Sequence, residues 1–407
     1  MKSSHIRNAI FAISILVFVA ACGGGGSGAA PQPPPSGGGP GIPPSPIDPG
    51  VLGDGRMTEL VETIRDRHDL PALAAVIVNG GQIADQGASG VRSITSGAAV
   101  TTTDRWHIGS VTKAMTATLA AILVEQSVIS WDTTPLDIWP EFAASMHPQY
   151  ASVTVVDLLS HQAGLRVAVD TIPSISEVVN PARGGGVVSK RRLWAKELLE
   201  LSPVNATGGF LYTNAGYIIV GSMLETITGS EWATLMVDQL FGPLGMTQTG
   251  FGAPGTAGQF DQPYGHREEN GILVTVPPGP GADNPRAIGP AGTVNTTLAD
   301  FAQFMFAHLE GERGIPGLVT AETFQFLHTP VRNASYALGW DTDNDQASTE
   351  GPVFFHLGSN LRWFANAGLA PGLNIGVLMV TNTANDAAGE GTDELGQLLV
   401  QRILNSR

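Results

Sequence analysis

Apolar positions follow three different spacings in the first third of the chain, and each spacing predicts one kind of element. At residues 57–68 they recur every three to four positions, which predicts an amphipathic helix. A continuous apolar run at 72–78, the turn residues Asn79-Gly80-Gly81 and the segment 82–87 together predict a β-hairpin. From 110 to 124 nearly every face is apolar or small, which predicts a buried helix.

The last third alternates strands with turns and closes on a helix. Thr297-x-x-Asp300 is a capping box that predicts a helix at 297–309. Strands are predicted at 336–340, 353–357, 362–369 and 373–381, and the closing helix at 392–404. Because strands gather at both ends of the chain, we predict an α+β fold, in which helices flank one antiparallel sheet built from both ends and a helical lobe is inserted.

The N-terminus carries a separate signal. Lys2 and Arg7 precede an apolar run at 9–21, which is too short to cross a roughly 30 Å hydrocarbon core and suits a signal peptide. The run ends in Val19-Ala20-Ala21-Cys22, which is similar to a bacterial lipobox, where the cysteine is freed by cleavage and acylated. We therefore expect a signal peptide at 1–21 and lipidation of Cys22. The alternative is an ordinary signal peptide that is cleaved elsewhere.

A tether follows the cysteine. Gly and Pro occupy 19 of the 28 positions from 23 to 50, a composition that cannot bury a core. We expect a linker at 22–50 and one large domain at 51–407. The expected location is periplasmic or at the cell surface, anchored to a lipid bilayer. Gly23 after the cysteine favours the outer membrane in a Gram-negative host.

Composition excludes several classes of protein. With 36 acidic and 21 basic residues the formal net charge is −15, which argues against binding of nucleic acid. Cys22 is the only cysteine, so no intramolecular disulfide forms. The histidines show no His-Glu-x-x-His spacing, and no serine lies in Gly-x-Ser-x-Gly. We expect no metal and no cofactor, and the sequence leaves the oligomeric state open.

Ser110 and Lys113 are the leading candidates for chemistry. At a spacing of i, i+3 on a helix, the hydroxyl and the amine lie on one face. Ser110 stands at the predicted helix start, where free N–H groups favour a developing oxyanion. Lys113 is the only charged residue from 111 to 124, and burial lowers the pKa of a lysine until its amine can act as a base. In the alternative interpretation Ser110 only caps the helix and Lys113 extends to solvent.

Two further segments carry candidate groups. Tyr212 is a phenol that can relay a proton, and Asn214 is an amide that can orient an acyl group or, equally, cap a helix at 215–228. His356-Leu357-Gly358 ends a predicted strand, and a glycine there lets the backbone approach a ligand. The N–H of Ser359 is then a candidate oxyanion donor beside that of Ser110. The alternative for His356 is a core histidine bonded to a carbonyl.

In this order, Ser-x-x-Lys, Tyr-x-Asn and His-x-Gly resemble the serine β-lactamase and penicillin-binding-protein superfamily. The segments 106–109, 158–165, 244–246 and 290–297 agree, and the resemblance runs from about 57 to 405. It is nearest to class C β-lactamases, D-alanyl-D-alanine carboxypeptidases and β-lactamase-like carboxylesterases. It implies an antiparallel sheet sandwiched by helices, with the site in the cleft beside the helical lobe.

The resemblance also implies roles. Ser110 is the expected nucleophile, Lys113 its base, Tyr212 the proton shuttle and Asn214 a substrate-orienting amide. His161 falls in a family segment that we interpret as structural.

His356 departs from the family pattern, because classical β-lactamases carry lysine there, and this puts β-lactam hydrolysis in doubt but not acyl transfer. Arg362 could compensate if its side chain faces the site. We expect a serine hydrolase that acts on a small ester, amide or lactam, as an esterase or a peptidase. A true β-lactamase and a penicillin-binding sensor without turnover remain as alternatives.

Overall fold

The computed structural model describes residues 47–166, 185–279, 281–332, 335–344 and 350–407. Residues Gly50–Arg407 form one compact unit, separate from Met1–Pro49. The expected signal peptide, Cys22 and most of the expected linker lie outside the described residues. No helix within the described ranges is long and apolar enough to cross a bilayer.

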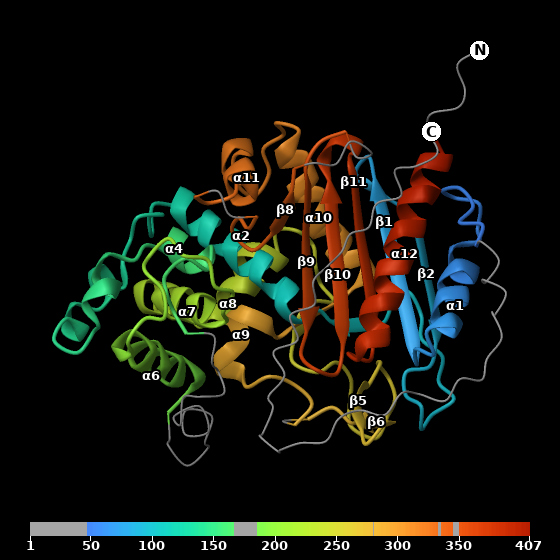
Figure 1. The fold of residues 1–407 in the computed structure, drawn as a ribbon, viewed down its shortest axis with the longest axis horizontal. Helices are drawn as coiled ribbons and strands as arrows, with labels where there is room; N and C mark the ends of the chain where they lie inside the picture. Colours follow the sequence, from blue (N-terminus) through green and yellow to red (C-terminus); the bar gives the residue numbers. More distant parts are fainter. Residues whose placement is uncertain (1–46, 167–184, 280, 333–334, 345–349) are drawn as a thin grey trace, which may run out of the picture. The chain divides into compact units, whose positions relative to one another are not determined.

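A six-stranded antiparallel sheet forms the centre of the larger unit, in the order β2-β1-β11-β10-β9-β8 (Figure 1). Its strands are β1 (Ala72–Asn79), β2 (Gln82–Gly90), β8 (Asp341–Asp343), β9 (Val353–Ser359), β10 (Phe364–Ala370) and β11 (Ile375–Thr381). The N-terminal hairpin β1–β2 pairs with the last strand, β11, through the register Leu73↔Thr381 to Asn79↔Ile375. The prediction that both ends of the chain build one sheet is therefore confirmed.

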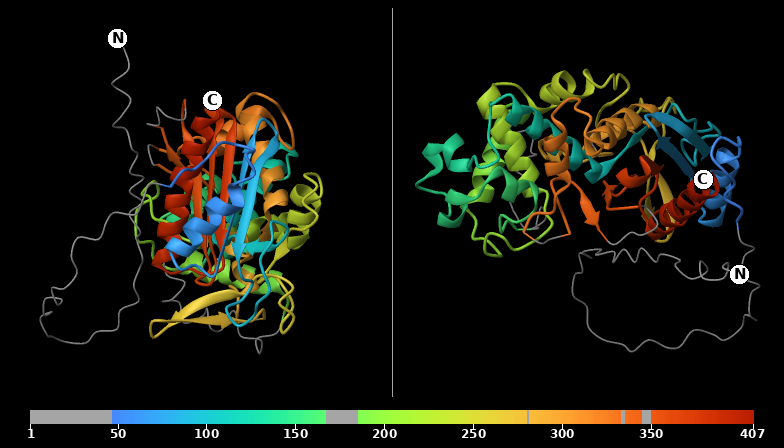
Figure 2. Two further views of the ribbon diagram at one scale, coloured as in Figure 1. Left: turned by 90° about the vertical axis from the view of Figure 1, so that its right-hand side faces the viewer. Right: turned by 90° about the horizontal axis from the view of Figure 1, so that it is seen from above.

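Helices cover both faces of this sheet (Figure 2). The helices α1 (Met57–Arg67) and α12 (Asp386–Asn405) pack together on one face, and α10 (Leu298–Glu312) packs on the other. Strand β1 is consequently buried at every position from Ala72 to Val78, as a central strand between two helical layers must be. Thr297 caps α10 by accepting from the N–H of Asp300, as its sequence predicts.

The remaining helices form a lobe beside the sheet (Figure 1). They are α2 (Thr112–Glu125), α3 (Pro135–Ile138), α4 (Val155–Leu159), α6 (Val187–Glu200), α7 (Ala215–Thr228), α8 (Trp232–Leu235), α9 (Gly289–Gly292) and α11 (Ala321–His328). Short 3-10 turns include η1 (Gly109–Val111), η2 (Pro140–Phe142), η3 (Pro148–Ser152), η6 (Arg286–Ile288) and η8 (Pro371–Leu373), and η5 (Met236–Phe241) is a π-helix. Helix α2 lies in the core: every residue from Thr112 to Leu123 is buried, as predicted for a helix that is apolar all round.

Two small sheets complete the unit. One has the order β3 (Arg105–His107), β7 (Val294–Thr297), β4 (Gly250–Phe251), and the other pairs β5 (Gly265–Glu269) with β6 (Ile272–Val276). None of these strands was predicted from the sequence. They are short, so a two-residue alternation has few positions in which to appear.

Two predicted elements are wrong in their extent. Residues 336–340 form only an isolated bridge, Tyr336↔Asp341, because the chain turns at Gly339, whose φ is +87° and where a methyl group would lie 2.6 Å from Cα of Ala114. The closing helix starts at Asp386 instead of residue 392, because the side chain of Asn385 accepts from the N–H of Ala388 and caps it there.

Candidate active site

Ser110 lies at the junction between the small sheet and the buried helix. Strand β3 ends at His107, the turn η1 carries Ser110, and α2 continues from Thr112. Lys113, in the first turn of α2, has none of its surface exposed. The i, i+3 spacing places its Nζ 2.9 Å from Oγ of Ser110.

Lys113 makes two further contacts, and they determine what its amine can do. Nζ lies 2.8 Å from Oδ1 of Asn214 and 2.9 Å from the carbonyl oxygen of Ala291. Both of these oxygens can only accept, so they take two N–H bonds. A neutral amine has two N–H bonds, so its lone pair remains for the third neighbour, the Ser110 hydroxyl.

Burial favours this neutral form, because desolvation lowers the pKa of Lys113 well below its usual value. Among the described residues, no carboxylate forms an ion pair with Nζ. The rings of Tyr212 and Tyr217 lie 4.9 and 5.6 Å from Nζ and favour the charged form by roughly 0.5–2 kcal/mol each. Desolvation of a fully buried lysine exceeds that, so the amine can serve as a base.

Tyr212 lies beside the same pair of residues. Burial raises the pKa of its phenol above the usual value, and a hydrogen bond with the Ser110 side chain opposes that rise. The residue as a whole is 37% exposed, so Tyr212 lies where the site opens to solvent. A phenol that stays protonated can pass on a proton but is not a base.

Asn214 is next to the first turn of α7 without capping it through its side chain. The Thr213 hydroxyl accepts from the N–H of Ala215 instead, at 3.1 Å, which leaves the Asn214 amide free to contact Lys113. His161 steadies this segment: its buried Nδ1 accepts from the N–H of Thr213 at 3.3 Å, and its ring lies 4.4 Å from that of Tyr212.

His356 lies in the wall of the site, with only 2% of its surface exposed. Nδ1 lies 2.6 Å from the carbonyl oxygen of Leu357 and therefore carries the ring proton, so Nε2 accepts from the Tyr336 hydroxyl at 3.0 Å. Burial is the main cause that lowers the pKa of His356, to about 3. This geometry agrees with the alternative interpretation of His356 as a core histidine bonded to a carbonyl, and both of its ring nitrogens have protein partners.

Gly358 and Gly109 bring the two expected oxyanion donors together. A methyl group on Gly358 would lie 2.0 Å from the carbonyl oxygen of Ile108 and 3.0 Å from the nitrogen of Ser110. A methyl group on Gly109, whose φ is +48°, would lie 2.3 Å from the nitrogen of Ser359. Only paired glycines permit this approach of β9 to η1, which brings the backbone nitrogens of Ser110 and Ser359 close together.

Arg362 occupies the turn that follows β9. Its guanidinium donates to the carbonyl oxygen of Asn360 at 3.1 Å, and burial is the main cause that lowers its pKa.

The backbone carbonyl of Ala291 is the group at this site that the sequence did not indicate. A carbonyl has no side-chain signal, so only the fold reveals it.

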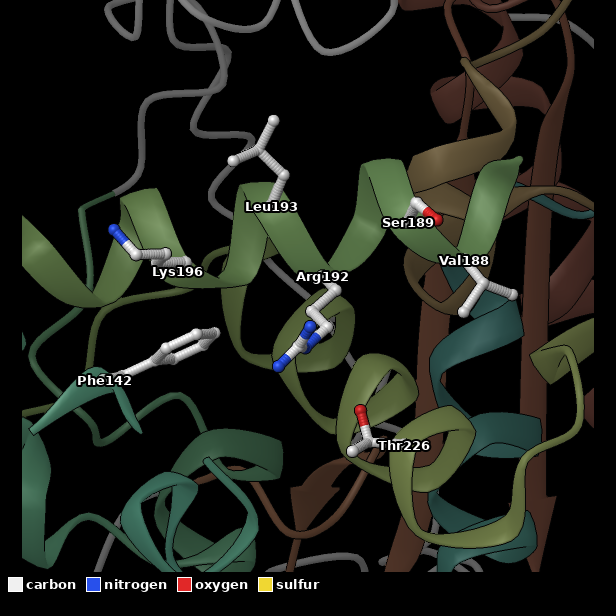
Figure 3. A pocket seen from close by; sticks show the side chains of 7 residues that line it. All are labelled: Phe142, Val188, Ser189, Arg192, Leu193, Lys196 and Thr226. Carbon is white, nitrogen blue, oxygen red and sulfur yellow. The ribbon is translucent and has the colours of Figure 1, made fainter. Parts of the chain in front are cut away.

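The hollow drawn in Figure 3 is not this site. It has a volume of about 450 Å³ and lies between η2, α6 and α7, where Phe142, Arg192, Leu193, Lys196 and Thr226 line it. Neither Ser110 nor Lys113 lines it. The candidate site is therefore located by the buried lysine and its contacts, and this hollow plays no part in that assignment.

Comparison with known proteins finds relatives that align with nearly the whole domain. The model of the beta-lactamase family matches residues 57–401. Penicillin-binding protein 4 of Amycolatopsis lactamdurans is 30% identical over 334 residues, which cover 80% of this chain and 84% of that protein. The unguisins hydrolase ungD' of Aspergillus campestris is 24% identical, with 88% of this chain and 66% of the fungal protein covered.

Solved structures share the fold. The octameric penicillin-binding protein homologue from Pyrococcus abyssi aligns with a TM-score of 0.67 at 20% identity, over 86% of this chain and 78% of that one. SurE aligns with a TM-score of 0.68 at 22% identity, over 86% and 76% of the two chains. The family match spans most of the chain and the same fold recurs in these structures, so the protein belongs to the beta-lactamase family.

Proposed function

We propose that this protein is a serine hydrolase that forms an acyl-enzyme on Ser110 with Lys113 as the base. One observation carries the proposal: the fully buried amine of Lys113 lies 2.9 Å from Oγ of Ser110, and its two other neighbours, Oδ1 of Asn214 and the carbonyl oxygen of Ala291, can only accept. Membership of the family supports it, because serine hydrolases are typical of that family.

In the proposed acylation, the Ser110 proton moves to Nζ of Lys113 while Oγ bonds to the acyl carbon. The carbonyl electron pair becomes an oxyanion, which the N–H groups of Ser110 and Ser359 hold. The bond to the leaving group then breaks, and the leaving group takes the proton, with the neutral phenol of Tyr212 as relay. Water attacks the acyl-enzyme by the same steps and regenerates Ser110.

The proposed substrates are small uncharged esters or amides. β-Lactams and D-Ala-D-Ala peptides carry a carboxylate that a permanent charge at position 356 would hold. The His356 ring is neutral and has protein partners at both nitrogens. The guanidinium of Arg362 is held by the turn after β9. We therefore expect good turnover of p-nitrophenyl esters and weak turnover of nitrocefin.

Covalent labelling tests the central step. Intact-mass spectrometry of the soluble body lacking residues 1–50, after exposure to a fluorophosphonate or a penicillin, should show one adduct. Ser110→Ala should show none while it keeps the wild-type melting temperature, because the hydroxyl is small and lies at the helix start. Equal labelling of the alanine variant would disprove the proposal.

We also propose that the enzyme works as a lipoprotein, with Cys22 acylated and residues 22–50 as its tether. The apolar run before Cys22 and the Gly/Pro-rich stretch after it support this. Such a tether would let the active site reach substrates within a layer of some tens of Å, at about 3 Å per residue.

A further inference from the structure

The carboxylate of Asp283, whose side chain is 9% exposed, connects the segment before Ser110 to the turn after Ser359. His107 has none of its surface exposed, and its Nδ1 accepts from the N–H of Gly109 at 3.1 Å. In a neutral ring the proton is then on Nε2, which lies 2.7 Å from Oδ1 of Asp283. The Nε2 contact lacks the geometry of a linear hydrogen bond, so it acts mainly through the carboxylate charge.

The same oxygen holds the turn between β9 and β10. Nδ2 of Asn360 donates to Oδ1 of Asp283 at 3.0 Å, and Asn360 is 3% exposed. Oδ1 of Asn360 in turn accepts from the N–H groups of Arg362 and Trp363, at 3.2 Å each. The ring of Trp363 stacks on His107 with centroids 5.6 Å apart, so the two segments meet in one packed cluster.

We propose that Asp283 is a positioning residue for the oxyanion donors, a role that rests on the proposed function. Through His107 it holds Gly109, which precedes the N–H of Ser110. Its carboxylate also holds the side chain of Asn360, the residue that follows Ser359. A single carboxylate oxygen therefore sets the distance between the N–H groups of Ser110 and Ser359, two residues that lie far apart in the sequence.

This separation matters most when charge develops. Both N–H groups have to reach the same oxygen in the transition state, and removal of one such donor typically costs 10²–10³-fold in kcat. A shift of about 1 Å can cost up to about 10²-fold. A substrate in the ground state, with little charge on its oxygen, depends less on the same spacing.

The test uses a swap of the two side chains. Asn360→Asp keeps the acceptor for Arg362 and Trp363 but sets two carboxylates against each other. Asp283→Asn keeps the size but loses the charge that faces His107. We expect kcat for p-nitrophenyl butyrate to fall about 10- to 100-fold in Asn360→Asp and less in Asp283→Asn, with KM little changed. The double variant restores a donor–acceptor pair and should recover part of the loss.

A transition-state analogue separates positioning from stability. A phenylboronic acid bonded to Ser110 places an oxygen between the donors, so its Ki should rise by the same factor by which kcat/KM falls. Glu312→Gln is the matched control, because Glu312 lies 2.6 Å from Nδ1 of buried His328 and has 15% of its side chain exposed, against 9% for Asp283. That variant should change only the melting temperature.

Three results would overturn the inference. They are wild-type kcat and Ki in both single variants, a double variant no better than Asn360→Asp, or an equal loss of kcat in Glu312→Gln. Ser110→Ala is measured alongside them. Turnover by the Ser110→Ala variant would disprove the proposed function itself. If Ser110→Ala is inactive while Asn360→Asp and Asp283→Asn are fully active, only the role of Asp283 is disproved.

Discussion

Replacement of Lys113 by methionine should abolish turnover and make the stability of the fold less dependent on pH. In the proposed mechanism the native amine is neutral, because burial lowers its pKa, whereas the lysine of the unfolded chain keeps a pKa near 10.4. Between these two pKa values, unfolding takes up one proton. The free energy of unfolding of the wild type therefore rises with pH in this interval, by about 1.4 kcal/mol per pH unit, and the effect ends above the unfolded pKa.

The variant lacks this contribution, and it also loses contacts. Lys113→Met would leave Oδ1 of Asn214 and the carbonyl oxygen of Ala291 without the Nζ donor, at about 1–3 kcal/mol each. That loss is independent of pH. The difference in unfolding free energy, Lys113→Met minus wild type, should thus fall by about 2.7 kcal/mol over any two pH units inside the interval. At its acidic end the inactive variant can be the more stable protein.

Urea unfolding at half-unit steps from pH 6 to 9 measures this slope. Lys196→Met is the control, because the side chain of Lys196 is 38% exposed and pairs with Glu200 at the surface. Its curve should run parallel to that of the wild type. Parallel curves for Lys113→Met as well would mean that native Lys113 keeps its proton, which would refute its assignment as a base.

The remaining expectations concern the wall of the site and the anchor. Gly358→Ala should lower kcat about 10²-fold by pushing β9 away from Ser110. Gly368→Ala is the control, because its methyl group would meet nothing nearer than 3.6 Å, and it should keep the wild-type kcat. Equal rates for the two variants would contradict the N–H groups of Ser110 and Ser359 as oxyanion donors. His356→Lys should raise the ratio of nitrocefin to p-nitrophenyl butyrate turnover about 2- to 30-fold, because a charged donor replaces a neutral ring; an unchanged ratio would separate position 356 from carboxylate recognition. Cys22→Ser should release the protein from the membrane fraction or leave an uncleaved precursor, and a wild type found only in the soluble fraction would count against lipidation.

Local pattern accounts for most of what the sequence predicted. The spacing of Ser110 and Lys113, the hairpin around Gly80 and the cap at Thr297 each depend on neighbours within a few residues. The position of the hairpin beside the C-terminal strands followed from the distribution of strands along the chain. Composition and periodicity carry such information because helices and strands have fixed repeats.

Orientation and distant partners could not be predicted. The carbonyl oxygen of Ala291 meets Lys113 only because α9 packs against α2, and no side chain marks it. The direction of the His356 ring depends on the Tyr336 hydroxyl, which a turn at Gly339 brings to it. The role of Asp283 depends on three segments that meet in space. None of these contacts leaves a periodic signal in the sequence.

The order of strands in the sheet also determines when this protein can fold. Strand β1 receives its inner neighbour only from β11, where Leu73 pairs with Thr381. The edge of β1 that pairs with β11 therefore stays unpaired during synthesis until β11 has been made. Such an edge readily joins other unfinished chains. We expect the rate of folding to be limited by the closure of this long loop between β1 and β11.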